Sequence, residues 1–100
     1  MSDTPEAEPA DKVRSAVLAV PGVAGLHAGA FGEAATYLPG RRVEGIRLRD
    51  ASCEVHLVLQ WGAPVRQTAE AVRAAASALS GTPVDVYVQD VAAPPRRRGS

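Results

Sequence analysis

The sequence predicts an α+β domain built as a two-layer sandwich, with two helices packed on one face of a three- to four-stranded mixed or antiparallel sheet. Residues 53–61 and 84–89 alternate between apolar and polar side chains, which is typical of strands with one buried face. Residues 11–20 and 64–79 carry apolar residues at helical spacing. Each helix has a single apolar stripe, so the two helices together can cover only one face of the sheet.

The first helix is predicted to begin with Asp11 as its N-cap and to run to about residue 20. Its apolar face consists of Val13, Ala16, Val17 and Val20. Pro21 and Gly22 end the helix, because proline cannot continue it and glycine permits a sharp turn. Residues 23–27 then form a short extended segment.

Residues 28–42 have no single predicted conformation. They are interrupted by two pairs of breakers, Gly29 with Gly32 and Pro39 with Gly40. Between these pairs, residues 33–38 could form either a helical turn or a short strand. Residues 43–49 are predicted to form one strand, with Ile46 and Leu48 on the same face, followed by a turn at residues 50–52.

The clearest strand is predicted at residues 53–61. Its inward side chains are Cys53, Val55, Leu57, Leu59 and Trp61, and its outward side chains are Glu54, His56, Val58 and Gln60. A helix then starts at Pro64 and ends before Gly81, with a buried stripe predicted to consist of Val65, Ala69, Val72, Ala76 and Leu79. In the last strand, Val84, Val86 and Val88 alternate with Asp85, Tyr87 and Gln89.

The two ends of the chain are predicted to be disordered tails around a domain at residues 11–91. Residues 1–10 combine prolines with acidic residues, and residues 92–100 contain a run of three arginines. Charge is balanced over the chain, with eleven basic and eleven acidic residues, which does not favour a general nucleic-acid binder. The single cysteine and the lack of a signal peptide or a membrane-spanning apolar run predict a reducing, cytoplasmic location without a direct membrane span.

The sequence contains no pattern that predicts catalysis, a cofactor or a metal site. His27, His56 and Glu54 could meet on adjacent strands, but two histidines on an exposed sheet are ordinary surface residues. Cys53 is expected to point inward, where cysteine behaves as a small hydrophobic residue. The Gly29-x-x-Gly32 motif resembles a loop of RNA-binding KH domains, but it lacks flanking helices and basic residues. We therefore expect a protein that is not an enzyme.

Several short motifs follow one another along residues 13–91. They are Pro21-Gly22-Val23, Gly45-Ile46, Trp61-Gly62, Leu79-Ser80-Gly81, Val84-x-Val86-x-Val88 and Asp90-Val91. In this order they resemble the alkaline-shock-protein family of bacterial envelope stress response proteins. The resemblance implies a non-enzymatic cytoplasmic scaffold that self-associates and is held near the membrane by a membrane-anchored protein partner. It carries over no catalytic residue.

The outer face of the sheet is the predicted interaction surface. Its proposed residues are Val58, Tyr87, Val91, His56 and Gln89. A mixed patch with an aromatic centre is typical of protein interfaces, although strand propensity alone also favours valine and tyrosine at these positions.

Two further possibilities remain open in the sequence. Arg96, Arg97 and Arg98 could add an electrostatic contact with an anionic membrane beside a protein anchor, or could simply keep the chain soluble. The alternative function is a small-molecule-sensing α+β module, for which the sequence shows no cluster of convergent polar groups.

Overall fold

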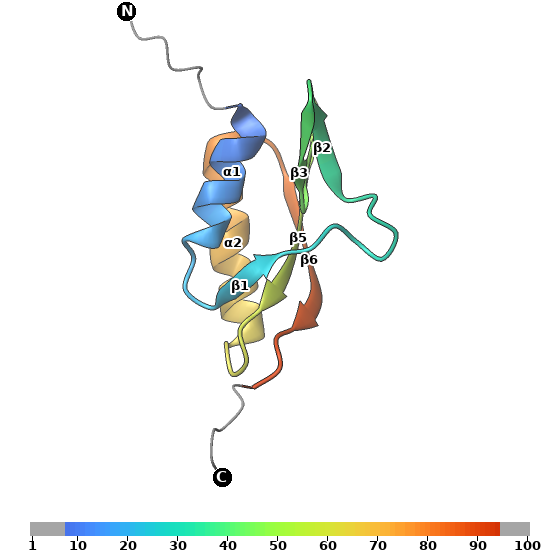
Figure 1. Ribbon diagram of the computed structural model, residues 1–100. Coiled ribbons are helices and arrows are strands. Elements are labelled where there is room, and N and C mark those ends of the chain that lie inside the picture. Colours follow the sequence, from blue (N-terminus) through green and yellow to red (C-terminus); the bar gives the residue numbers. More distant parts are fainter. Residues whose placement is uncertain (1–7, 95–100) are drawn as a thin grey trace, which may run out of the picture.

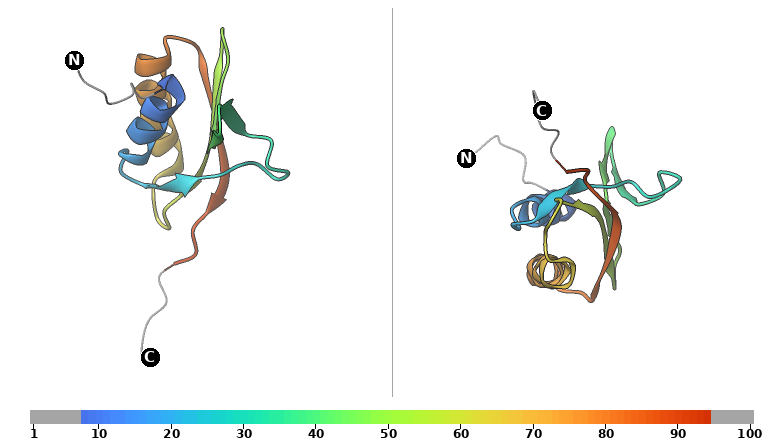
Figure 2. Two further views of the ribbon diagram at one scale, coloured as in Figure 1. Left: turned by 45° about the horizontal axis from the view of Figure 1, so that its top comes forward. Right: turned by 90° about the horizontal axis from the view of Figure 1, so that it is seen from below.

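A computed structural model describes residues 8–94 and confirms the predicted two-layer α+β fold. Both helices lie on one side of the main sheet (Figures 1 and 2). The elements in chain order are α1 (Pro9–Leu18), β1 (Val23–Leu26), β2 (Ala35–Leu38), β3 (Arg41–Glu44), β4 (Ile46–Leu48), β5 (Cys53–Leu59), α2 (Val65–Ser80) and β6 (Val84–Val91).

The main sheet is mixed and is built around β5. β6 runs parallel to β5 along its whole length, and α2 is the crossover that this parallel pairing requires. The other edge of β5 is shared by two short antiparallel strands, with β4 beside its first half and β1 beside its second half. β5 is therefore the central strand, and all its odd-numbered side chains are buried beneath the helices.

Residues 28–42, which the sequence left open, contain a loop and most of a two-stranded antiparallel hairpin. β2 and β3 pair from Ala35 with Glu44 to Leu38 with Arg41. The hairpin is fastened to the main sheet by Thr36, whose hydroxyl donates to the carbonyl of Ile46 and accepts the amide of Leu48 at 3.0 Å. One side chain thus satisfies the main-chain groups on the outer edge of β4.

The single strand predicted at residues 43–49 is wrong, because the chain breaks at Gly45. Gly45 has a φ of +85°, which ends β3 and starts β4 in a new direction. A Cβ at this position would lie 2.6 Å from Cβ of Leu26 and 3.0 Å from the carbonyl oxygen of His56. Both the left-handed conformation and the close approach therefore require glycine here.

The core lies between the helices and β5. It includes Val13 and Val17 of α1, Val72 and Ala76 of α2, and the inward side chains of β5. The stripe predicted on α2 is wrong at its ends, since Val65 and Leu79 are 53% and 48% exposed and Thr68 is buried. α1 has ten residues and α2 sixteen, so α1 is too short to cover the whole length of α2.

The boundaries of the domain differ from the prediction at three places. α1 begins at Pro9, so residues 9 and 10, predicted to be disordered, belong to the helix, and Ala10 is buried. Glu8, not Asp11, is the N-cap. Trp61 is not an inward strand residue, because β5 ends at Leu59 and the following turn leaves Trp61 61% exposed. Residues 1–7, and residues 95–100 with Arg96, Arg97 and Arg98, lie outside the described part of the chain.

Candidate interaction surface

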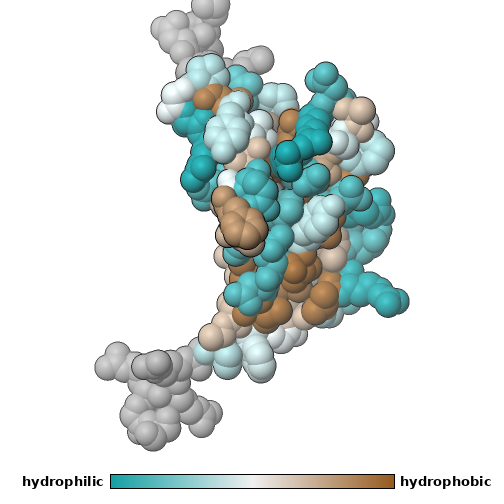
Figure 3. Space-filling model, turned by 90° about the vertical axis from the view of Figure 1, so that its right-hand side faces the viewer, coloured by the Kyte–Doolittle hydropathy of each residue, from teal (hydrophilic) through white to brown (hydrophobic). Residues whose placement is uncertain are grey.

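The candidate surface is the face of the main sheet that points away from the helices. In the described part of the chain neither helix lies over this face (Figure 2). Figure 3 shows it as a largely hydrophilic surface with a hydrophobic patch in its lower half. The outward residues of β5 and β6 and the loop between β1 and β2 contribute to this side of the molecule.

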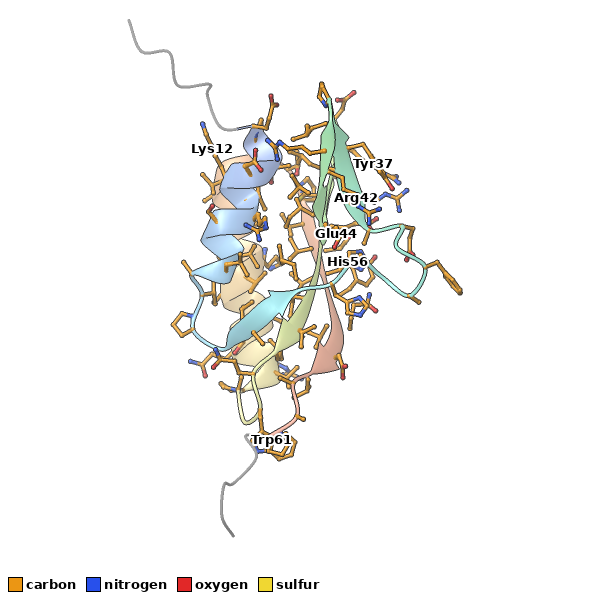
Figure 4. All side chains as sticks on the ribbon, in the orientation of Figure 1. Lys12, Tyr37, Arg42, Glu44, His56 and Trp61 are labelled. Carbon is orange, nitrogen blue, oxygen red and sulfur yellow. The ribbon has the colours of Figure 1, made fainter. Side chains whose placement is uncertain are left out.

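His56 lies on this side of β5, away from the helices (Figure 4), but it is only 7% exposed. The expectation of an exposed histidine is therefore wrong. Its imidazole ring stacks on the phenol ring of Tyr87, with centroids 4.6 Å apart and an interplanar angle of 15°. The two residues are direct partners in the parallel register of β5 and β6, which explains why their rings meet on the same face.

Both ring nitrogens of His56 have a hydrogen-bond partner. The side-chain amide of Gln89 donates to Nδ1 at 2.8 Å, and Nε2 lies 3.1 Å from Oε1 of Glu54. With Nδ1 accepting, the ring proton of a neutral imidazole must lie on Nε2 and be donated to the Glu54 carboxylate. The ring is thus held by two polar contacts and one stacking contact, and it forms a rigid support beneath Tyr87.

Tyr87 is the exposed centre of this cluster, with 43% of its surface accessible. Gln89 is also exposed, and Val58 is half-buried two residues further along β5. The structure therefore brings together His56, Tyr87 and Gln89 as the sequence predicted, with His56 as a support rather than a contact residue.

Val91 does not belong to the outer face. The register of β6 shifts between the partners of Leu57 and Val58, so Leu57 pairs with Val88 while Val58 pairs with Asp90. Gln89 is the extra residue of this bulge, and the alternation of side chains reverses after it. Val91 pairs with Leu59, whose side chain faces the helices, so the predicted placement of Val91 beside Tyr87 is wrong.

The loop between β1 and β2 adds an aromatic residue that the sequence did not point to. Phe31 is 92% exposed at the tip of this loop, which starts where the amide of His27 donates to the carbonyl of His56. The loop is closed by a hydrogen bond from the amide of Ala34 to the carbonyl of Ala28 at 2.8 Å. Phe31 is therefore presented by an organised loop next to the His56 cluster.

The carboxylate of Glu33 holds the tip of this loop. Its Oε1 accepts the amide of Phe31 at 3.0 Å, and main-chain N–H groups of Glu33 and Phe31 hold the pKa of this carboxyl below its ordinary value. Gly29 has a φ of +86°, and a Cβ there would lie 2.5 Å from Oε2 of Glu33. The sequence signal that could have pointed to Phe31 is the pair Gly29 and Gly32, since glycines at this spacing mark a tight loop that exposes the residues between them.

The remaining sequence candidates show no reactive arrangement. Cys53 is fully buried, and burial raises the pKa of its thiol. Among residues 8–94, no three His, Cys, Asp or Glu side chains lie together in a way that could hold a metal ion. In the same residues, neither helix combines the length and apolarity needed to cross a membrane.

A polar recess of about 610 Å³ lies on another side of the molecule, between α1, β1 and β3. Asp11 and Arg14 of α1 and Arg41 of β3 reach it, and Arg41 forms a bidentate ion pair with Asp11 at 2.6 and 3.0 Å. Arg42 and Glu44 also line the recess, but strand alternation turns their side chains away from Arg41.

No protein-family model, curated protein or solved structure matches the chain. The resemblance to alkaline-shock proteins therefore stays a prediction from the sequence motifs.

Proposed function

We propose that this chain is a non-enzymatic protein-interaction module that binds a protein partner through the outer face of its main sheet. The observation that carries the proposal is the support of Tyr87 by the buried ring of His56. An exposed aromatic side chain that is already rigid loses little conformational entropy on binding, which is a property of residues that dominate binding energy.

Two other features support this choice of surface. Phe31 stands almost fully exposed on an ordered loop that starts beside the cluster, and aromatic residues are enriched at protein interfaces. Polar groups surround both aromatic residues, among them Gln89 and the half-buried Glu54. An apolar centre within a polar rim is the usual composition of a protein interface.

The biological role in this proposal comes from the sequence motifs alone. Their resemblance to alkaline-shock proteins supports a cytoplasmic envelope-stress scaffold that a membrane-anchored partner holds near the membrane. A membrane protein captured with the chain would support this role, provided that its deletion releases the chain from the membrane fraction. A chain that stays in the membrane fraction without any such partner would argue against it.

The surface itself is tested by substituting its aromatic residues and measuring partner capture. Full-length protein carrying Val58→Thr with Tyr87→Ser, or Phe31→Ser, is expressed in its host, cross-linked and analysed by mass spectrometry. We expect each variant to keep the circular dichroism spectrum of the wild type and to lose partner capture at least about tenfold, a change of about 1.4 kcal/mol.

Trp61→Ser is the matched control. Trp61 is also an exposed aromatic residue, with an exposed fraction between those of Tyr87 and Phe31, but it lies at the end of the molecule near the last described residues (Figure 4). The control variant should bind as the wild type does. If it loses partner capture while the Tyr87 and Phe31 variants retain it, the interaction surface is at that end and the proposal is wrong.

A small-molecule sensor is the second candidate function, and the polar recess favours it. The recess has the size of an ordinary ligand site, and Arg14 forms no ion pair within the described residues. A thermal-shift screen of anionic metabolites separates the two functions. Stabilisation that Arg14→Gln abolishes would favour the sensor, since a ligand that binds only the folded state raises the melting temperature.

A further inference from the structure

The free edge of β6 is the longest unpaired strand edge in the described part of the sheet. β6 is the longest strand, and in residues 8–94 it pairs only with β5. An uncovered strand edge is a template for another strand, and many proteins protect it with bulges or charges. Here the bulge at Gln89 and the neighbouring Asp90 protect only the last part of the strand. The regular part, residues 84–88, carries a single charge, on Asp85.

The hydrogen-bonding pattern shows which main-chain groups this edge presents. The amide of Cys53 donates to the carbonyl of Pro83 at 3.0 Å, so the main chain of Pro83 turns towards β5. Main-chain direction alternates along a strand, which turns Asp85 and Tyr87 towards β5 as well. The N–H and C=O groups of Val84, Val86 and Val88 therefore point to the free edge.

The helix layer covers only the first part of this edge of the sheet. Val84, Val86 and Val88 pair with Cys53, Val55 and Leu57, so all three valines face the helices. Val84 is 7% exposed, Val86 is half-buried and Val88 is 36% exposed. Burial thus falls along the row, and apolar surface remains uncovered beside the edge.

We propose that two copies of this chain pair through the free edges of β6, antiparallel and centred on Val86. A two-fold axis perpendicular to the sheet is the only symmetric way to join the same strand edge of two copies, and it makes the pairing antiparallel. Val86 is the middle of the regular part of the strand, so this register uses every residue before the bulge.

The register is self-complementary in main chain, charge and apolar surface. Val86 pairs with Val86 of the other chain, and Val84 pairs with Val88 of the other chain. These three valines are the residues whose N–H and C=O groups point to the free edge. Asp85 lies opposite Tyr87, so no two like charges face each other. The valines of both copies form one continuous apolar row, and both helix layers lie on the same face of the joined sheet.

This inference goes beyond the proposed function, because it concerns the strand edge and not the outer face. Phe31→Ser tests the outer face without touching β6, and substitutions at Val86 test the edge. Loss of partner capture and loss of self-association are therefore separate results.

Disulfide cross-linking tests the register directly. Directly opposed residues of antiparallel strands have Cα atoms about 4.5–5.5 Å apart, within the range that a disulfide spans. Under mild oxidation we expect Val86→Cys to cross-link with itself, and a mixture of Asp85→Cys and Tyr87→Cys to cross-link although neither does so alone. The wild type, whose only thiol is the buried Cys53, should give no covalent dimer.

Sedimentation equilibrium tests the dimer without new thiols. Val86→Pro removes an N–H that points to the free edge, so the hydrogen bonds with β5 are kept and self-association should weaken at least about tenfold. Val86→Thr keeps both the N–H and the β-branched shape and should remain dimeric. A wild-type monomer at every soluble concentration, or an absent cross-link at position 86, would overturn the proposal even if Val86→Pro fails to fold.

Discussion

The imidazole of His56 and the phenol ring of Tyr87 stack across two parallel strands with their centroids 4.6 Å apart, and only Tyr87 is open to solvent. His56 also joins Glu54 to Gln89 through its two ring nitrogens. One buried side chain therefore connects the polar and the aromatic parts of the candidate surface.

Because of these contacts, His56→Ala should destabilise the fold. It removes two side-chain hydrogen bonds and the support of Tyr87, and each hydrogen bond contributes a net of about 0.5–1.5 kcal/mol. Urea unfolding followed by circular dichroism gives the free energy of unfolding. His27→Ala is the control, since the His27 ring makes one local contact, with the amide of Gly29, and its loss should cost much less. Equal losses for the two variants would show that His56 has no special role.

Gly45→Ala should lower the free energy of unfolding more than Gly32→Ala or Gly25→Ala. It forces a side chain into a φ of +85° and into contact with Leu26, and a strained residue of this kind costs about 1–3 kcal/mol before any clash. Gly32→Ala separates the backbone strain from the steric clash, because Gly32 has a φ of +74° but open space around it. Gly25→Ala, with neither constraint, should change the free energy of unfolding by less than about 0.5 kcal/mol. Similar losses at Gly45 and Gly32 would mean that close packing contributes nothing.

The parts of the fold that could be predicted from the sequence are those fixed by residues close together in the chain. The alternation along β5 and the spacing in α2 are repeated over many residues, so both elements and the burial of Cys53 and Val72 are readable from the chain. The break at Gly45 is not, because it depends on the approach of Leu26 from a distant strand.

The candidate surface was predictable only in part, for a similar reason. Tyr87 and His56 share a face by simple alternation, and the structure keeps them together. A bulge in β6 turns the side chain of Val91 to the other face of the sheet. Nothing in the residues Gln89 and Asp90 indicates this bulge in the sequence. Phe31 lies in a loop without periodicity, where burial cannot be inferred from spacing.

The ion pair between Arg41 and Asp11 should make stability depend on pH in the acidic range. The Arg41 hydrogen bonds hold the pKa of the Asp11 carboxyl below its ordinary value of 3.8. A carboxyl whose pKa is lower in the folded state stabilises the fold above its unfolded pKa, and this contribution is lost as the pH falls through the folded value. Arg41→Gln should therefore raise the pKa of Asp11 in an NMR titration and lower stability at neutral pH.

The difference in stability between the wild type and Arg41→Gln should shrink as the pH falls below the ordinary Asp11 pKa of 3.8, and it should vanish only below the lowered pKa of folded Asp11, where the carboxyl is protonated in both folded and unfolded chains. Arg42→Gln is the matched control, since Arg42 pairs with Glu44 on the same strand and should leave the Asp11 pKa unchanged. An Asp11 pKa that does not respond to Arg41→Gln would contradict the ion pair.

The arginines at positions 96–98 should strengthen binding to anionic membranes at low salt. Ala92 and Ala93, near the end of the described residues, line a small hollow together with the exposed Trp61. Each arginine near an anionic surface contributes about 1 kcal/mol. The run of arginines could therefore add roughly 3 kcal/mol, which is useful only beside a protein anchor.

Truncation after Ala93 tests this contribution in a vesicle sedimentation assay. The truncated chain should bind vesicles containing an anionic lipid more than about tenfold less tightly than the full chain at low ionic strength, where charge screening is weak. The difference should disappear at high salt and on neutral vesicles, because the attraction is electrostatic. Replacing the three arginines with glutamine should reproduce the truncation. If truncation leaves binding to anionic vesicles unchanged at low ionic strength, the arginines make no membrane contact and act only to keep the chain soluble.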